Sequence, residues 1–174
     1  MSKIISKWIT GLCLAVAATS TLLSAAAQQS TAPDRGFVIV RPEEIRWQAS
    51  PGAPGLQTAA ISGDPGKPGL YVLRVKFSPG VMTRPHVHNE DRYVAVLQGT
   101  WWVGTGTVFD PDSTTPLKPG SFMKHPAGAE HYDGAKDEEV ILQIVGMGAA
   151  GTTFLKPELG PVGSSRPAER APSR

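Results

Sequence analysis

The chain has 174 residues, with 17 lysines and arginines, 15 acidic residues, four histidines and one cysteine. This length is enough for a single domain with a sizeable core. The small net charge of +2, with no run of basic residues, argues against a nucleic-acid partner, because phosphate binding needs clustered cations.

Residues 1–27 have the pattern of a secretory signal peptide. Two lysines precede an apolar stretch, and small residues at Ser24–Ala27 are typical of a signal-peptidase site. A transmembrane anchor is the alternative, but the stretch is short for a span and polar residues interrupt it. We expect cleavage after Ala27 and a periplasmic or secreted protein with no membrane span. Cleavage would remove two lysines and Cys13, which leaves a formally neutral chain without disulfides.

After a flexible lead-in over 28–36, short apolar segments alternate with glycine and proline turns, and no useful helical periodicity is present. The predicted strands cover Tyr71–Phe77, Arg92–Leu97, Trp101–Val108, Ser121–His125, Glu139–Val145 and Thr152–Leu155. Residues 63–69 are predicted to form an exposed loop, and the proline-, serine- and arginine-rich tail over 157–174 is predicted to be disordered. Such short strands, with turns every eight to twelve residues, predict an all-β antiparallel sandwich or barrel over 37–156.

The histidines lie in two short motifs. His86 and His88 are two residues apart, so on a strand their side chains would project from the same face. His131, from a neighbouring strand, can supply a third imidazole to one face of a divalent metal site. The fourth histidine, His125, lies within the second motif.

Glycine and proline residues stand at fixed distances from these histidines in the sequence. Five residues separate Gly80 from His86-x-His88, and Gly99 closes this motif; Gly120 is followed after five residues by Pro126, then Gly128 and His131. Over about residues 70 to 150 this pattern resembles the two motifs of the cupin superfamily. The resemblance implies a single RmlC-like jelly-roll barrel, often a homodimer, with His86, His88 and His131 in its mouth as ligands to Fe, Mn, Ni or Zn.

Two positions depart from the cupin pattern. Arg92 stands where the family usually places a glutamate ligand, and Ala135 stands at the usual asparagine. Strand alternation predicts that Arg92 faces inward with Val94 and Val96, beside the histidines. A guanidinium cannot ligate a metal, and a cation 4 Å from another repels it by roughly 4 kcal/mol per unit-charge pair at an intermediate dielectric.

Three arrangements would compensate for the arginine, and the sequence leaves them open. Glu90 or Asp91 can approach as a carboxylate ligand or pair with Arg92. An anionic substrate can be clamped by the guanidinium in a bidentate fork. Alternatively the barrel holds no metal and is a non-catalytic protein that binds or senses small anions.

Further candidates surround these residues. His125 is a possible additional ligand or proton shuttle, although an imidazole on the outer surface is the commoner outcome. Tyr93, Trp101 and Tyr132 are candidate substrate-binding residues, with sheet packing as the alternative. Glu130 can orient His131 as a hydrogen-bond acceptor, or face solvent. Cupins include isomerases, oxygenases, decarboxylases and storage or sensor proteins, so the reaction, whether oxidoreductase or lyase/isomerase, stays open.

Overall fold

The computed structural model describes residues 36–166, so the predicted signal peptide, most of the lead-in and the last eight residues lie outside the described part. The chain divides into two units, Met1–Phe37 and Val38–Arg174. The second unit contains all the described helices and strands. None of the described helices has the length and hydropathy needed to cross a bilayer.

The described residues form short strands and three single-turn 3₁₀ helices, with no α-helix among them, in agreement with the sequence prediction. The 3₁₀ helices are η1 (Pro42–Glu44), η2 (Pro111–Ser113) and η3 (Pro157–Leu159). The strands are β1 (Gln48–Ala49), β2 (Leu56–Ser62), β3 (Gly69–Phe77), β4 (Val81–Thr83), β5 (His86–His88), β6 (Arg92–Gln98), β7 (Trp101–Thr105), β8 (Thr115–Leu117), β9 (Phe122–His125), β10 (His131–Ala135), β11 (Val140–Gly148), β12 (Thr152–Phe154) and β13 (Val162–Ser164).

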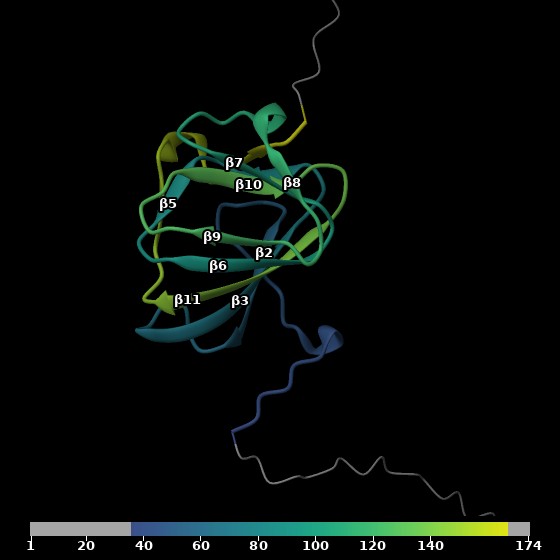
Figure 1. Cartoon of the computed structure of the whole chain (residues 1–174), viewed down its shortest axis with the longest axis vertical. Coiled ribbons are helices and arrows are strands. Elements are labelled where there is room, and N and C mark those ends of the chain that lie inside the picture. The colour runs from purple at the N-terminus through teal and green to yellow at the C-terminus, as the bar shows by residue number, and fades with distance from the viewer. Residues whose placement is uncertain (1–35, 167–174) are drawn as a thin grey trace, which may run out of the picture. The chain divides into compact units, whose positions relative to one another are not determined.

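The strands form two antiparallel sheets that face each other. One sheet has the order β1-β2-β3-β11-β6-β9, and the other has the order β12-β5-β10-β4-β13, with β7 and β8 attached beside β10. Figure 1 shows β3, β6, β9 and β11 in one layer and β5, β7, β8 and β10 in the other. The crossovers between non-consecutive strands are those of a jelly roll, so the predicted all-β barrel is confirmed.

The core lies between the two layers because each strand alternates inward apolar and outward residues. On β11, Val140, Leu142 and Ile144 are buried, and on β6 the predicted inward pair Val94 and Val96 is buried as well. The core residues are Tyr71, Val75, Phe77, Val94, Val96, Trp101, Val103, Ala135, Val140, Leu142 and Ile144. Each large side chain of this kind contributes about 1.5–3 kcal/mol by leaving water.

The glycines of the two histidine motifs end strands in backbone conformations that other residues rarely adopt. Gly80, Gly99 and Gly120 have φ values of 84°, 72° and 89°. At Gly99 a side chain would also collide with the carbonyl oxygen of Glu139. These bends return the chain so that β5 and β10 lie side by side with their histidines facing inward.

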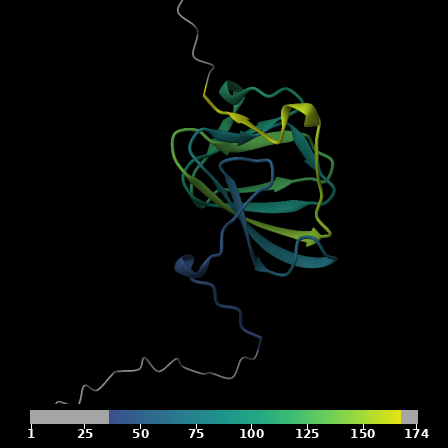
Figure 2. The same cartoon turned by 180° about the vertical axis from the view of Figure 1, so that it is seen from behind.

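The prediction of a disordered tail from residue 157 is wrong for residues 157–166. There η3 and β13 follow, and β13 pairs antiparallel with β4, with Val162 opposite Thr83. Arg84 N–H donates to the Pro161 carbonyl at 2.9 Å, and Ser165 N–H donates to the Gly80 carbonyl at 2.9 Å. Figure 2 shows this yellow segment lying along the upper layer. Backbone pairing with the edge of a sheet orders the segment, and a composition-based prediction does not detect such pairing.

A chain ending at Lys156 is therefore expected to be less stable than the full chain by about 1–3 kcal/mol, because it loses the β13 ladder and its flanking backbone hydrogen bonds. Urea unfolding followed by circular dichroism measures this difference. Leu159→Ser is the control, since that side chain is exposed and its loss leaves the backbone pairing in place. Equal stability of the shortened and full chains would contradict a structural role for β13.

Candidate metal centre

A cavity of about 290 Å³ lies inside the barrel and is lined by both polar and apolar residues. Its polar lining comes from His86, His88, Arg92, His125, Asp133, Thr83 and Thr152. Its apolar lining includes Leu56, Leu73, Val75, Phe77, Val94, Trp101, Leu142, Ile144 and Phe154. The loop from Ser50 to Ala53 contributes further residues to the wall.

His86 and His88 project together from β5 and are 3% and 5% exposed. Their Nε2 atoms are 3.2 Å apart. His86 Nδ1 is 2.8 Å from the carbonyl oxygen of Arg84, so it carries a proton and leaves the Nε2 lone pair facing the cluster. His88 Nδ1 faces the Thr152 hydroxyl at 3.1 Å, which can donate or accept.

His131 lies opposite His86 in the β5–β10 ladder. Its Nδ1 is 3.0 Å from the carbonyl oxygen of Ala129 and donates to it, while its buried Nε2 has no hydrogen-bond partner among the described residues. The ligand atoms of His86, His88 and His131 all lie within 4.8 Å of one another. The structure thus brings the three predicted ligands together in a buried group that can hold a metal.

Burial lowers the pKa of His86, His88 and His125 and so keeps these three imidazoles neutral. Removal from water lowers the pKa of His86 to about 3, with the neighbouring His131 adding to the effect. Burial also lowers the pKa of His88, and it lowers that of His125 to about 2. A neutral imidazole offers a free lone pair, which is the form that ligates a metal.

His125, at the end of β9, is buried rather than on the outer surface, contrary to the outcome that the sequence favoured. Its ring centroid lies 3.9 Å from that of His131 and 5.5 Å from that of Trp101. Neither ring nitrogen has a hydrogen-bond partner among the described residues. His125 therefore belongs to the histidine cluster.

Asp133 is a member of the cluster that the sequence prediction missed. It follows His131 by two residues on β10, so both side chains face inward, and it is 5% exposed. Its Oδ2 lies 3.8 Å from His131 Nε2, and burial raises the pKa of the carboxyl. The ligand atoms of His125, His131 and Asp133 also lie within 4.8 Å of one another. Residues two apart on a strand face the same side, so the spacing of Asp133 from His131 could have identified it from the sequence.

Arg92 lines the cavity as predicted and is paired with a carboxylate. Its Nε donates to Glu90 Oε1 at 2.8 Å, and the two side chains are only 11% and 10% exposed. The Tyr71 hydroxyl donates to the same oxygen at 2.9 Å, and Gly151 N–H donates to the other at 3.3 Å. Of the arrangements left open by the sequence, the structure shows the pairing of Glu90 with Arg92. Glu90 is part of neither metal-ligating group.

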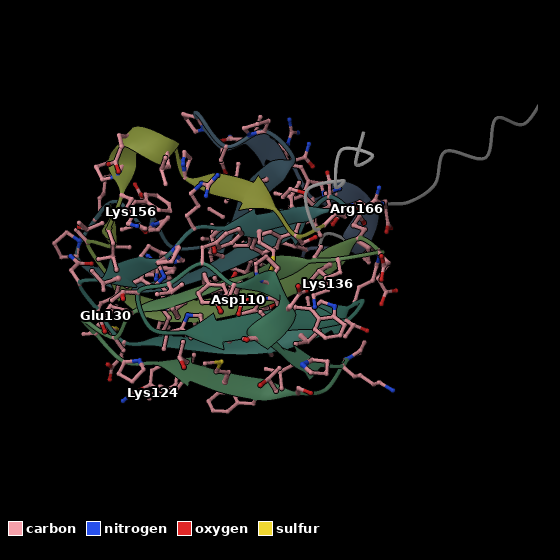
Figure 3. The ribbon with its side chains drawn as sticks, turned by 90° about the horizontal axis from the view of Figure 1, so that it is seen from above. Asp110, Lys124, Glu130, Lys136, Lys156 and Arg166 are labelled. Carbon is pink, nitrogen blue, oxygen red and sulfur yellow. The ribbon has the colours of Figure 1, made fainter. Side chains whose placement is uncertain are left out.

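Asp91 is turned away from the histidines, which contradicts its prediction as a further ligand. Its carboxylate pairs with Lys124 at 2.6 Å and accepts from Ala127 N–H at 2.9 Å, and these hydrogen bonds lower its pKa. Both Lys124 and Glu130 are exposed and lie at the outer edge of the fold in Figure 3. The Ala129 carbonyl, and not Glu130, orients His131.

Of the three predicted aromatic residues, only Trp101 lines the cavity. Tyr93 lies on the outer face of β6, where it is 45% exposed and stacks on Phe122, so the prediction of substrate contact is wrong for this residue. Tyr132 alternates with His131 and therefore projects from the opposite face of β10. There it is buried, and its hydroxyl donates to the Asp110 carbonyl at 2.9 Å, away from the cavity.

Residues 35–150 match the model of the family described as the ChrR Cupin-like domain, which is more than half of the chain. The chain belongs to the ChrR cupin-like family. No curated protein sequence matches it significantly. In this cupin Arg92 occupies the motif position that usually holds a glutamate, and it forms an ion pair with Glu90. The carboxylate beside the imidazoles is that of Asp133 on β10.

Many solved structures share the fold. The polyketide cyclase RemF from Streptomyces resistomycificus has 19% identity and a TM-score of 0.57, over 68% of this chain and 85% of that one. The DMSP lyase DddQ from Ruegeria pomeroyi has 17% identity and a TM-score of 0.55, over 67% and 64%. A sugar phosphate isomerase of the cupin superfamily from Silicibacter pomeroyi has 19% identity and a TM-score of 0.51, over 67% and 80%. At these identities the likeness shows the fold alone.

Proposed function

We propose that this cupin is an exported protein that binds one divalent metal ion and acts on, or binds, a small organic anion in its barrel. The observation that carries the proposal is the convergence of His86, His88 and His131 within 4.8 Å, all buried. Export rests on the signal-peptide pattern of residues 1–27.

The donor atoms fit a borderline divalent ion such as Fe, Mn, Ni or Zn. Two adjacent ligands each about 2.1 Å from one ion lie roughly 3.0–3.4 Å apart, and the Nε2 atoms of His86 and His88 are separated by 3.2 Å. Backbone carbonyls hold the Nδ1 protons of His86 and His131, an arrangement typical of histidine ligands. When bound, the ion would supply a Lewis acid with open positions, which suits lyase, isomerase or oxygenase chemistry.

Arg92 is the group that we propose binds the anion. Its Nε donates to Glu90, and because the side chain lines the cavity we propose that its other guanidinium nitrogens donate to a ligand carboxylate. Because Glu90 cancels the arginine charge, the repulsion expected between Arg92 and a metal is largely removed. A divalent ion together with Asp133 then leaves a formal charge of roughly +1, which suits a monoanionic ligand.

The apolar residues of the cavity lining indicate the nature of the rest of the ligand. Leu73, Val94 and Ile144 line it from the sheet that contains β3, β6 and β11, and Phe154 lines it from β12 in the other sheet. A cavity of about 290 Å³ with a mostly apolar lining and a cluster of polar residues accommodates a small molecule with an apolar body and one anionic group. The ligand class that we propose is therefore a small carboxylate with an aliphatic or aromatic body.

Arg92→Gln is expected to weaken the binding of hexanoate at least tenfold, because a hydrogen bond to a charged group contributes about 1.5–3 kcal/mol. Isothermal titration calorimetry of the purified mature protein measures this change. Hexanamide, a neutral ligand of the same size, should bind both proteins equally. The metal content should stay unchanged, since Arg92 is not a ligand.

The matched control is Lys124→Gln, which removes an exposed cation that pairs with Asp91 outside the cavity. This variant should bind hexanoate as the native protein does. Undiminished hexanoate binding by Arg92→Gln would remove the proposed role of Arg92.

A metal-free protein that binds or senses anions is the second candidate, and one contact favours it. His88 Nε2–H can donate to His86 Nε2 at 3.2 Å while the Thr152 hydroxyl donates to His88 Nδ1 at 3.1 Å, which satisfies both rings without an ion. Elemental analysis of protein prepared without chelator separates the two candidates. We expect about one ion per chain, whereas the second candidate gives a clearly substoichiometric content.

A further inference from the structure

A second set of metal-ligating atoms lies beside the first and shares one histidine with it. His125, His131 and Asp133 come from β9 and β10, and their ligand atoms lie within 4.8 Å of one another. All three residues are at most 5% exposed. The cupin motifs account for His131 in this set, but not for His125 or Asp133.

The ring nitrogens of His125 lack hydrogen bonds within the described part of the chain. Both nitrogens are buried without a hydrogen bond among residues 36–166, although buried polar groups in proteins are nearly always paired. The ring centroids nearest to that of His125 are those of His131, at 3.9 Å, Trp101, at 5.5 Å, and His88, at 6.1 Å. A cation that accepts a lone pair from His125 would satisfy one of these nitrogens.

Hydrogen bonds between β10 and β4 fix the position of Asp133 beside His125 and His131. Its backbone N–H donates to the Thr83 hydroxyl at 3.0 Å, and that hydroxyl donates to the Asp133 carbonyl at 3.0 Å, which ties β10 to β4. Within the described residues, its only basic neighbour within 4.0 Å is His131, whose Nε2 lies 3.8 Å from Oδ2. Buried carboxylates are normally paired or bound to metals, and a cation at this point would stabilise the ionised form of Asp133.

We infer that this cupin has an alternative metal position formed by His125, His131 and Asp133, and that a single ion occupies either this position or that of His86, His88 and His131. His131 Nδ1 is committed to the Ala129 carbonyl, so Nε2 is its only ligating atom and serves one ion at a time. This inference rests on the proposed metal-binding function. In this chain Arg92 occupies the position where cupins usually have a glutamate ligand. In the proposed alternative position, Asp133 of β10 supplies a carboxylate ligand instead.

The two positions differ in chemistry. The first offers three neutral nitrogens, and the second offers two nitrogens and a carboxylate oxygen, which suits the oxygen-preferring ions Mn²⁺ and Fe²⁺ better. The preferred position should therefore depend on the metal. Zn²⁺ is expected at the three-histidine position and Mn²⁺ at the position that includes Asp133.

The test uses Co²⁺, whose visible absorption reports its ligands, added to the purified mature protein. The double variant His86→Ala/His88→Ala is expected to keep about one Co²⁺ per chain, with affinity lowered about 10–100-fold and a changed spectrum. Adding Asp133→Asn to that double variant should abolish binding. Asp133→Asn alone should retain one ion, because the three-histidine position is intact.

X-ray absorption of the unmodified protein needs no substitution and covers the case in which a variant fails to fold. It should count about three imidazoles around Zn²⁺ and about two around Mn²⁺. Three imidazoles around both ions would overturn the second position. A folded His86→Ala/His88→Ala variant that binds no Co²⁺ would do the same and leave the proposed function standing. Failure of the unmodified protein to bind any metal would overturn both.

Discussion

Replacing His131 with alanine is expected to lower the metal content from about one ion per chain to less than about a tenth, a larger loss than any other single substitution in the cluster. His131 contributes Nε2 to both groups of ligand atoms, so its removal leaves only two residues in each. Two protein ligands hold a divalent ion far less tightly than three. Elemental analysis after dialysis, and Co²⁺ titration, measure the loss.

The neighbouring Glu130→Gln variant is the control. Glu130 adjoins His131 in the chain but is exposed, and its side chain takes no part in the cluster. Its metal content should equal that of the native protein, and both variants should keep the circular dichroism spectrum of a β-barrel. If a folded His131→Ala variant binds an ion with native affinity, neither metal position exists as described.

The part of the site that could be predicted depends on local spacing. His86 and His88 face the same way because strands alternate with a period of two, and the glycines at 80, 99 and 120 bend the chain as expected. The inward direction of Arg92 also follows from alternation along β6. These features need only the residues of one strand and the turns beside it.

The features of the site and fold that the sequence did not reveal depend on pairing between segments that are distant in the chain. His125 lies directly opposite Arg92 in the β6–β9 ladder, and opposed residues share a face, so the register turns His125 inward. The sequence alone does not give that register. The same holds for β13, which is ordered by its pairing with β4, and for Glu90, a loop residue whose partner Tyr71 lies on β3.

The wrong predictions for two aromatic residues, Tyr93 and Tyr132, have a different cause. Tyr93 is adjacent to Arg92 and Tyr132 is adjacent to His131, and closeness in sequence suggested closeness to the cavity. Alternation places each of them on the face opposite to its neighbour. Trp101 reaches the cavity because its strand, β7, pairs with β10.

Gly146→Ala is expected to destabilise the fold by about 2–6 kcal/mol and to weaken anion binding as well. Gly146 lies opposite Tyr71 in the β3–β11 ladder, and the tyrosine ring lies across it. A Cβ at this position would meet the ring and hydroxyl of Tyr71, with the ring carbon that bears the hydroxyl at 2.6 Å. Overpacking of this kind costs about 1–3 kcal/mol, and the lost hydrogen bond to the buried Glu90 adds about 1–3 kcal/mol.

The coupling to binding follows from the Tyr71–Glu90–Arg92 chain of contacts. When Tyr71 moves, Glu90 loses its hydroxyl donor, and the guanidinium that Glu90 orients is no longer held against the cavity wall. Urea unfolding and hexanoate titration report the two effects separately. Tyr71→Phe keeps the ring and removes only the hydroxyl, so it should reproduce most of the binding loss with a smaller loss of stability. Gly66→Ala, in the exposed loop before β3, should change neither quantity. If Gly146→Ala weakened folding but left hexanoate affinity intact, Arg92 would not depend on this support.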